Sequence, residues 1–169
     1  MTIAKPLLLT EFGDDYATAK EREPLHQPLP ADLPQQAGVF VSIKKHGQLR
    51  GCIGTIKATQ PSLASEVINN AVSAGTQDPR FFPVELDELP DLTFSVDVLG
   101  EEEEIAGPEF LDPKRYGIIV RRAHRSGLLL PNLEGVDTVD EQLAIARQKA
   151  GIGPREEVKL SRFEVKRFY

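Results

Sequence analysis

The stretch Gly38–Ile56, which reads GVFVSIKKHGQLRGCIGTI, decides the fold of this chain. It contains two runs of β-branched and apolar residues that meet at His46 and Gly47. Glycine readily adopts the positive φ angle that a tight two-residue turn requires. We therefore predict a β-hairpin with its turn at His46 and Gly47.

This hairpin would bring Arg50 and Cys52 onto one face of the sheet. With a two-residue loop, Val41 pairs with Cys52 and Ile43 pairs with Arg50. The Cα atoms of Arg50 and Cys52 are then about 6.6 Å apart along one strand. A neighbouring guanidinium favours the thiolate, which is the nucleophilic form of cysteine. Arg50 and Cys52 are therefore the candidate catalytic residues.

Gly51 and Gly54 flank Cys52 and are candidate supporting residues. Glycine forms strands poorly, so a pair of glycines here indicates a bulge or the close approach of another backbone or of a ligand. The alternative is that Cys52 is a small core residue and the glycines only bend the strand. Its predicted neighbours Val41 and Ile43 favour that alternative, because apolar surroundings disfavour the thiolate.

Three further polar residues are candidates for substrate binding or support. Asn70 borders the apolar stripe of a predicted helix, where its amide can hydrogen-bond toward the sheet. Asp78 and Arg80 surround Pro79, an arrangement that suits an ion pair holding the loop and equally suits an arginine directed toward an anion. A purely structural role is the alternative for all three.

The rest of the chain predicts two similar units. In the first, a helix from Pro61 to Gly75 and a strand over residues 92–99 follow the hairpin. In the second, a hairpin around residues 124–126 precedes a helix over residues 139–150, whose capping box is Thr138 and Glu141, and a strand over residues 157–168. Gly38 aligns with Gly117. We predict a mixed α/β fold of the α+β class with two subdomains and duplicated ββαβ units, although two common units following one another would give the same pattern.

The predicted boundaries follow from proline and charge. Residues 1–37 form an irregular proline-rich N-terminal arm, in which at most Asp14–Glu23 makes a short helix and the leucines suit covering an apolar surface. Residues 38–169 form the main domain. Within it, residues 38–100 are the first unit, residues 101–115 an acidic linker with a solvated run at Glu101–Glu104, and residues 116–169 the second unit.

Composition excludes several classes of function. The 169 residues carry a net charge of −6 with a pI near 5.2, which argues against general binding to nucleic acid or to an anionic membrane. One cysteine and three histidines cannot close a cysteine-rich metal site, and the sequence identifies no cofactor. A lone thiol, with no membrane-spanning run and no signal peptide, favours a cytoplasmic location.

The histidines are poor partners for Cys52. His46 lies at the hairpin tip, about 17 Å from the row of Cys52, so it cannot act as its base within this hairpin. His124 occupies the tip of the second hairpin and would reach Cys52 only if the two halves pack tip to middle, and His26 lies in the irregular arm, so a contact with the thiol stays open for both. Each is more simply a solvated residue.

The hexapeptide LRGCIG at residues 49–54 resembles the hallmark of the AMMECR1 domain family. The similarity continues through GVFVSIKKHGQLRGCIGTI, NNAVSAGTQDPRFFPV and GLLLPNLEGVDTVDEQLAIARQKAGI, and covers nearly everything from residue 38 to residue 152. The resemblance implies a fold of two subdomains and a site around the cysteine, without an assigned activity. It is strongest to the component that accompanies Memo-like and radical SAM proteins in three-part systems, so these are the implied partners.

Two classes of function remain open. In the first, a small enzyme uses Cys52 with Arg50 in a pocket between the subdomains on a small polar ligand. In the second, a non-catalytic accessory module binds Memo-like and radical SAM partner proteins. A polar pocket that contains Cys52 would favour the enzyme, and an exposed apolar patch would favour the module.

Overall fold

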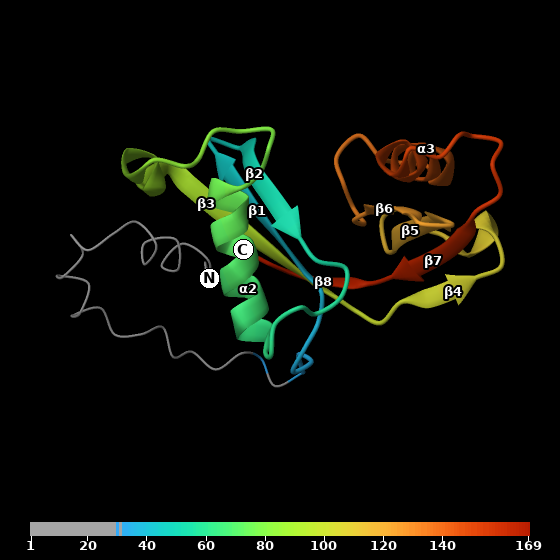
Figure 1. The fold of residues 1–169 in the computed structure, drawn as a ribbon, viewed down its shortest axis with the longest axis horizontal. Coiled ribbons are helices and arrows are strands. Elements are labelled where there is room, and N and C mark those ends of the chain that lie inside the picture. The colour runs from blue at the N-terminus through green and yellow to red at the C-terminus, as the bar shows by residue number, and fades with distance from the viewer. Residues whose placement is uncertain (1–29, 31) are drawn as a thin grey trace. The chain divides into compact units, whose positions relative to one another are not determined.

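The computed structural model describes residues 30 and 32–169, which form two compact units (Figure 1). The first unit ends at Val98 and also includes Arg167–Tyr169, and the second spans Leu99–Lys166. The proline-rich arm predicted over residues 1–37 lies mostly outside the described residues. The short helix expected over Asp14–Glu23 and the residue His26 lie outside them too.

The first unit is a four-stranded sheet with one long helix. Its elements are β1 (Val39–Lys45), β2 (Gln48–Gly54), α2 (Leu63–Thr76), the 3₁₀ helix η2 (Leu86–Asp91), β3 (Leu92–Leu99) and β8 (Val165–Phe168). The strand order is β2-β1-β3-β8. His46 and Gly47 have φ angles of 50° and 82°, and Lys45 pairs with Gln48. The predicted hairpin and its turn are therefore confirmed.

The register of this hairpin differs from the prediction. Cys52 pairs with Ser42 and Gly51 pairs with Ile43, because the pairing shifts by one residue between Ile43 and Lys44. Such a β-bulge places one extra residue in β2. The predicted pairing of Val41 with Cys52 is therefore wrong, and the thiol lies opposite a hydroxyl.

The bulge brings Gly51 to the place where α2 packs on the hairpin. A Cβ atom on Gly51 would lie 2.1 Å from the carbonyl oxygen of Ala74, so only glycine lets the helix approach the strand this closely. The shift turns Gly51 toward the helix and Cys52 away from it. Val39, Val41 and Ile43 are fully buried and form the core with apolar residues of α2 and β3.

The second unit repeats this arrangement. Its elements are β4 (Glu103–Ile105), the 3₁₀ helix η3 (Pro108–Phe110), β5 (Gly117–Arg122), β6 (Arg125–Leu129), α3 (Val139–Ala150) and β7 (Lys159–Phe163), and its strand order is β4-β7-β5-β6. The predicted capping box of Thr138 and Glu141 is present at the start of α3. Each unit thus contains a hairpin, a helix and a third strand antiparallel to the first. The predicted α+β class is confirmed.

The fourth strand of each sheet was not expected. The C-terminal strand predicted over residues 157–168 is two strands, and β7 belongs to one sheet while β8 belongs to the other. Likewise, the predicted linker over residues 101–115 contains β4, which pairs with β7. The strand that follows the first ββαβ repeat, β4, therefore belongs to the second sheet. The strand that follows the second repeat, β8, belongs to the first sheet.

The alignment of the two units also needs a correction. Lys45 and Arg122 end the first strands of the two hairpins, and counting back from them aligns Gly117 with Phe40 rather than with Gly38. This alignment places Ile119 and Leu128 of the second unit where Ser42 and Cys52 stand in the first.

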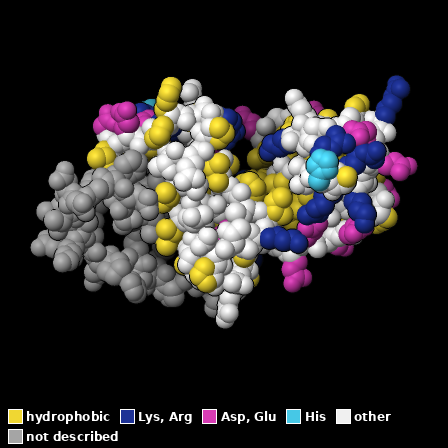
Figure 2. Space-filling model, in the orientation of Figure 1, with side chains coloured by type: hydrophobic (Ala, Val, Ile, Leu, Met, Phe, Trp, Pro, Cys, Tyr) yellow, Lys and Arg dark blue, Asp and Glu magenta, His cyan; other side chains and the backbone are white. Residues whose placement is uncertain are grey.

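The acidic run is held to the second sheet rather than simply solvated. Its last three residues form ion pairs, Glu102 with Arg121, Glu103 with Arg162, and Glu104 with Lys159. Figure 2 shows Lys, Arg, Asp and Glu side chains mixed over the second unit in this view. The visible face of the first unit is largely uncharged.

Candidate functional site

Asp78 and Arg80 close the exposed edge of β2 at Cys52. The backbone N–H of Cys52 donates to Asp78 Oδ2 at 2.8 Å, and its carbonyl oxygen accepts from Arg80 Nη2 at 3.3 Å. The Arg80 guanidinium also binds both oxygens of Asp78, at 2.9 and 2.7 Å. The pair thus replaces a neighbouring strand, because it satisfies both backbone groups that an edge strand leaves open.

The buried Asp78 carboxylate is held in its charged form. Hydrogen bonding from the Arg80 side chain lowers the pKa of Asp78 well below its usual range, although burial acts in the opposite direction. The backbone N–H of Cys52 adds to the lowering. Asp78 therefore fixes the backbone of Cys52 as an anion and does not serve as a proton acceptor near neutral pH.

The thiol lies in a row of small polar side chains across three strands. Ser42 Oγ donates to Cys52 Sγ at 3.3 Å, and Ser42 also pairs with Ser95 on β3. We call Cys52, Ser42 and Ser95 the polar row; all three are half-buried. The next row along the sheet holds Asp97, which is buried and bound to Arg167 at 2.7 and 3.2 Å.

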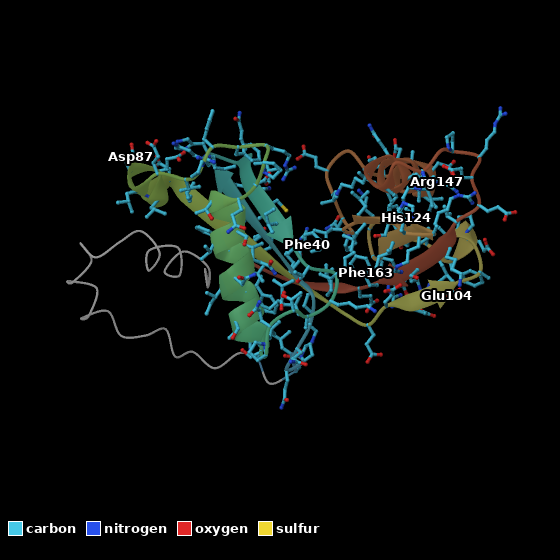
Figure 3. All side chains as sticks on the ribbon, viewed as in Figure 1. Phe40, Asp87, Glu104, His124, Arg147 and Phe163 are labelled. Atoms are coloured by element: carbon cyan, nitrogen blue, oxygen red, sulfur yellow. The ribbon has the colours of Figure 1, made fainter. Side chains whose placement is uncertain are left out.

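Gly54 makes room for an aromatic ring. A Cβ atom on Gly54 would lie 2.3 Å from the ring of Phe40, its partner on β1. Figure 3 labels Phe40 on the first unit. The glycines predicted as supporting residues thus meet protein atoms, Gly51 the helix backbone and Gly54 this ring.

Arg50 is directed away from the thiol. Its guanidinium binds Glu88 at 3.1 and 2.8 Å and donates to the carbonyl oxygens of Phe82 and Pro83 at 2.8 and 3.2 Å. Lys45 Nζ reaches the same carboxylate at 3.0 Å. We call Lys45, Arg50 and Glu88 the clamp. The predicted partnership of Arg50 with Cys52 is corrected: the guanidinium that contacts Cys52 belongs to Arg80.

The clamp makes Glu88 strongly acidic. Hydrogen bonding from Arg50 lowers the pKa of Glu88 from 4.5 to about 2, against the opposing effect of burial. The backbone N–H of Glu85 also donates to this carboxylate, at 3.0 Å. One charged carboxylate therefore joins the hairpin to the loop that follows α2.

The second unit carries a similar clamp without a thiol. Glu156 accepts from Arg122 and Arg125 at 2.7 and 2.8 Å, and from the backbone N–H of Gly153, three residues earlier, at 2.6 Å. Its pKa is lowered to about 2, chiefly by the hydrogen bond from Arg125. Leu128 stands there in the position of Cys52. Arg125 pairs with Arg122 as Gln48 pairs with Lys45, so Arg50, the extra residue of the bulge, has no positional counterpart there. A similar clamp that forms where no cysteine exists nevertheless supports a structural role for Arg50.

Asn70 belongs to a buried network that includes Glu66, a residue that sequence reasoning missed. Asn70 Nδ2 donates to the Val39 carbonyl oxygen at 3.1 Å. Glu66 is fully buried and accepts from Thr55 Oγ1 at 2.6 Å and from the N–H of Gln60 at 2.7 Å. Burial raises the pKa of Glu66, but these hydrogen bonds outweigh it and the net shift is downward. The available signal was its spacing, because Glu66 lies three residues after Leu63 and four before Asn70 and so shares the buried side of the helix.

This network also has a counterpart in the second unit. Glu66 and Gln142 each stand four residues after the N-cap of their helix, and both are fully buried. Gln142 Nε2 donates to the Tyr116 carbonyl oxygen at 2.7 Å. Tyr116 precedes its hairpin turn by the same number of residues as Val39. The helix-to-strand amide bond is thus duplicated, which supports the structural alternative for Asn70.

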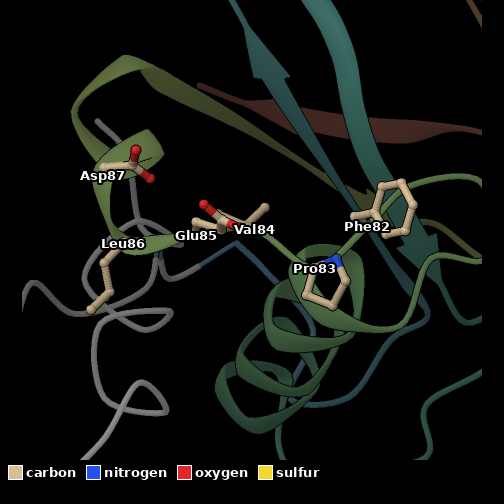
Figure 4. A pocket seen from close by; sticks show the side chains of 6 residues that line it. All are labelled: Phe82, Pro83, Val84, Glu85, Leu86 and Asp87. Atoms are coloured by element: carbon tan, nitrogen blue, oxygen red, sulfur yellow. The ribbon is translucent and has the colours of Figure 1, made fainter.

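The segment Phe82–Asp87 presents the most exposed of the large hydrophobic side chains among the described residues. Phe82 is 91% exposed and Leu86 is 44% exposed, and the segment lines a surface pocket (Figure 4). Its backbone is nevertheless fixed, by Arg50 at Phe82 and Pro83 and by the bond from Val84 N–H to the Gly75 carbonyl oxygen at 2.7 Å. Sequence reasoning missed Phe82, because nothing in DPRFFP separates it from Phe81.

Two further observations concern residues 30 and 32–169. Among them, no cluster of three His, Cys, Asp or Glu side chains is arranged to hold a metal ion, and no helix has the length and apolar character that a membrane crossing needs. His46 lies at the hairpin tip, 3.7 Å from Asp91.

Comparison with known proteins places the chain in a family. The sequence profile of the AMMECR1 family matches residues 10–168. A Thermotoga maritima protein is 52% identical over 136 residues, covering 79% of this chain and 78% of the relative. Protein CA_C1420 of Clostridium acetobutylicum is 57% identical over 130 residues, covering 77% of this chain but only 28% of that longer protein. The crystal structure of the uncharacterized protein PH0010 from Pyrococcus horikoshii matches with a TM-score of 0.79 and 31% identity, covering 98% of this chain and 86% of that one. The chain belongs to the AMMECR1 family.

Proposed function

We propose that this domain is a non-catalytic binding module that docks onto a partner protein through the segment Phe82–Asp87. The observation that carries the proposal is Phe82, an aromatic ring that is 91% exposed on a backbone held by the clamp. At this exposure the ring buries very little apolar surface within the unit, so burial contributes little to its stability. A rigid aromatic side chain is the kind of residue that dominates binding energy at protein interfaces.

The clamp supports this function by fixing the segment in advance. Ordering a loop on binding costs free energy, and a segment that is already ordered avoids that cost. Arg50 donates hydrogen bonds to the carbonyl oxygens of Phe82 and Pro83. The next residue, Val84, is buried in the core and anchors the segment there. The ring of Phe82 can therefore enter a partner's pocket with little loss of backbone freedom.

The charge beside Phe82 indicates the chemistry of the partner. Glu85 and Asp87 are exposed, whereas Glu88 is neutralised by the clamp. An apolar anchor with acidic neighbours fits an apolar pocket with a rim of Lys or Arg. The Memo-like and radical SAM proteins implied by the family resemblance are the partners to test first, and the longer clostridial relative supports a domain that works beside other protein parts.

A catalytic role for Cys52 is the second candidate, and the polar row is the observation that favours it. A half-buried thiol beside the Ser42 hydroxyl, with Arg80 on its backbone, suits a small polar or anionic ligand. Nucleophilic catalysis also needs a base that contacts the thiol. The described contacts of Cys52 are with Ser42, Asp78 and Arg80, and Asp78 is engaged as an anion. The geometry therefore supports the binding module better.

The experiment measures binding of the full chain to purified Memo-like and radical SAM proteins of the same organism by isothermal titration calorimetry. Phe82→Ala should weaken binding about 30-fold or more, as expected for a central aromatic anchor. Phe110→Ala is the matched control, because Phe110 is 47% exposed and lies in the second unit. Equal binding by Phe82→Ala and the natural chain would refute the docking segment. Loss of binding on Cys52→Ala alone would favour the polar row instead.

A further inference from the structure

Four arginines gather where α3 ends, at the loop 151–157 and at the tip of the hairpin formed by β5 and β6. They are Arg122, Arg125, Arg147 and Arg155, and the acidic residues among them are Glu156 and Glu157. Four cations against two carboxylates leave a local charge of +2, in a chain whose net charge is −6. We call these six residues the basic patch.

Hydrogen bonds to the loop hold three of these arginines in place. Arg122 and Arg125 bind Glu156 at 2.7 and 2.8 Å, and Arg122 also donates to the Glu157 carbonyl oxygen at 2.9 Å. Arg147 donates to two carbonyl oxygens of the loop, at 2.8 and 2.9 Å. The patch is therefore ordered before a partner binds, which avoids part of the entropy cost of association.

Two arginines of the patch carry a charge that no carboxylate of the described residues matches. Carbonyl oxygens satisfy N–H groups of Arg147 without supplying a negative charge. Arg155 is exposed, and its side chain has neither a hydrogen bond nor an ion pair with residues 30 and 32–169. Such guanidinium groups are able to bind carboxylates of another molecule.

The positive excess belongs to this patch and not to the neighbouring strands. There, Arg121 pairs with Glu102 and Lys159 pairs with Glu104, so these charges are matched. Figure 2 shows Lys and Arg side chains around the histidine of the second unit, which is His124 at the hairpin tip, and Figure 3 labels it. The basic patch is thus a local feature on a surface of mixed charge.

The corresponding loop of the first unit has the opposite charge. Glu88 and Glu156 each accept from the backbone N–H three residues earlier, so these two loops align at their clamps. One residue before each glutamate, the first unit has Asp87 and the second has Arg155. Both residues are exposed. The shared clamp does not require either charge, which leaves each free to serve binding.

We propose that the basic patch is a second docking surface, which binds an exposed segment rich in Asp and Glu on a partner protein. The planar guanidinium of arginine binds carboxylates through two parallel hydrogen bonds. A single small anion would compete with the tethered Glu156 carboxylate for Arg122 and Arg125. A segment with several carboxylates reaches Arg147 and Arg155 as well, so it gains contacts that one small anion lacks.

The number of cations argues against nucleic acid as the occupant. Specific binding to nucleic acid commonly neutralises about 6–10 phosphates, whereas the patch has four arginines, two of which share Glu156. The surface is also distinct from the segment Phe82–Asp87, whose acidic neighbours fit a basic rim. The two surfaces therefore select partners of opposite charge, and failure of one leaves the other intact.

Nuclear magnetic resonance of the isotope-labelled full chain tests the surface with a synthetic peptide of alternating Glu and Asp residues. We expect the amide signals of residues 122–125 and 147–157 to shift. Binding should weaken as salt rises from about 50 to about 300 mM, because salt screens exposed charges. A peptide of Gln and Asn of equal length should cause no shifts. Unshifted signals at these residues, or tighter binding of inorganic phosphate or of a single-stranded RNA oligonucleotide, would overturn the proposal.

Arg155→Glu and Lys57→Glu form a matched pair for this titration. Both residues are exposed, both substitutions change the net charge equally, and Lys57 lies in the first unit. Arg155→Glu should weaken binding of the acidic peptide about fivefold, as expected for reversing one exposed charge. Lys57→Glu should weaken it less than about twofold, since exposed charges act over short distances in salt. Equal weakening by the two variants would show an effect of net charge alone and refute a docking surface here.

A thermal unfolding measurement accompanies both variants. Because the Arg155 side chain has no contact of this kind with the described residues, Arg155→Glu should unfold at the temperature of the natural chain. Its loss of peptide binding then reports the surface and not the fold.

Discussion

Arg50→Ala separates a structural role of this arginine from a role in activating Cys52. The substitution removes the two hydrogen bonds to Glu88 and the two to the carbonyl oxygens of Phe82 and Pro83. It leaves Glu88 with Lys45 and the Glu85 N–H. It removes no contact of the Cys52 side chain that the structure shows.

The magnitude follows from the burial of the pair. Breaking a fully buried ion pair by removing one partner costs about 3–5 kcal/mol. The Arg50 and Glu88 side chains retain 16% and 15% of their exposure, and Lys45 stays on the carboxylate. We therefore expect Arg50→Ala to lower the free energy of unfolding by about 2–3 kcal/mol. For a chain of this length, the midpoint temperature of thermal unfolding should fall by roughly 4–12 °C.

The assay combines calorimetric unfolding with the rate of Cys52 alkylation by iodoacetamide at a fixed pH. We expect lower stability and, below the unfolding transition, an unchanged alkylation rate. Arg125→Ala is the matched control, because Arg125 holds the corresponding clamp in the second unit. Unchanged stability together with severalfold slower alkylation would refute the clamp and restore Arg50 as the activating cation.

Two further predictions test the same geometry. Because the pKa of Glu88 falls from 4.5 to about 2 on folding, its contribution is fully present above pH 4.5 and is lost as the pH falls toward 2. Glu88→Gln should therefore flatten the loss of stability between pH 5 and 2, by on the order of 2–3 kcal/mol, and an acid titration with the same slope as the natural chain would contradict this. Gly51→Ala should destabilise the first unit by at least about 2 kcal/mol in urea unfolding, because its new Cβ would meet the Ala74 carbonyl oxygen at 2.1 Å; a change below about 0.5 kcal/mol would show that the helix moves aside freely.

The elements that the sequence predicted correctly are those with local signals. The turn at His46 and Gly47 needs only two residues with positive φ, and the start of α3 needs only the capping box of Thr138 and Glu141. Both signals lie within a few residues of the structure that they determine. The order of hairpin, helix and strand follows from such signals repeated along the chain.

The site was less predictable because its contacts join distant residues. Arg50 meets Glu88 across 38 positions, and Cys52 meets Asp78 across 26. The bulge turns Cys52 toward Ser42 and sets Gly51 at the close approach of α2. Hydrophobic alternation along β2 contains no trace of that approach, so a regular register was the natural but incorrect prediction.

The duplication itself separates structure from function within the site. A carboxylate held by cationic side chains of the hairpin and a helix-to-strand amide bond occur in both units, which indicates that they stabilise this ββαβ unit. The first unit alone combines Cys52, its Asp78–Arg80 pair and the exposed Phe82, while Leu128 replaces the cysteine in the second. Features that one copy of a repeated unit carries and the other lacks are free of the demands of the fold. The search for function therefore belongs on the edge of β2 and the segment Phe82–Asp87, whose carbonyl oxygens at Phe82 and Pro83 are bound by Arg50.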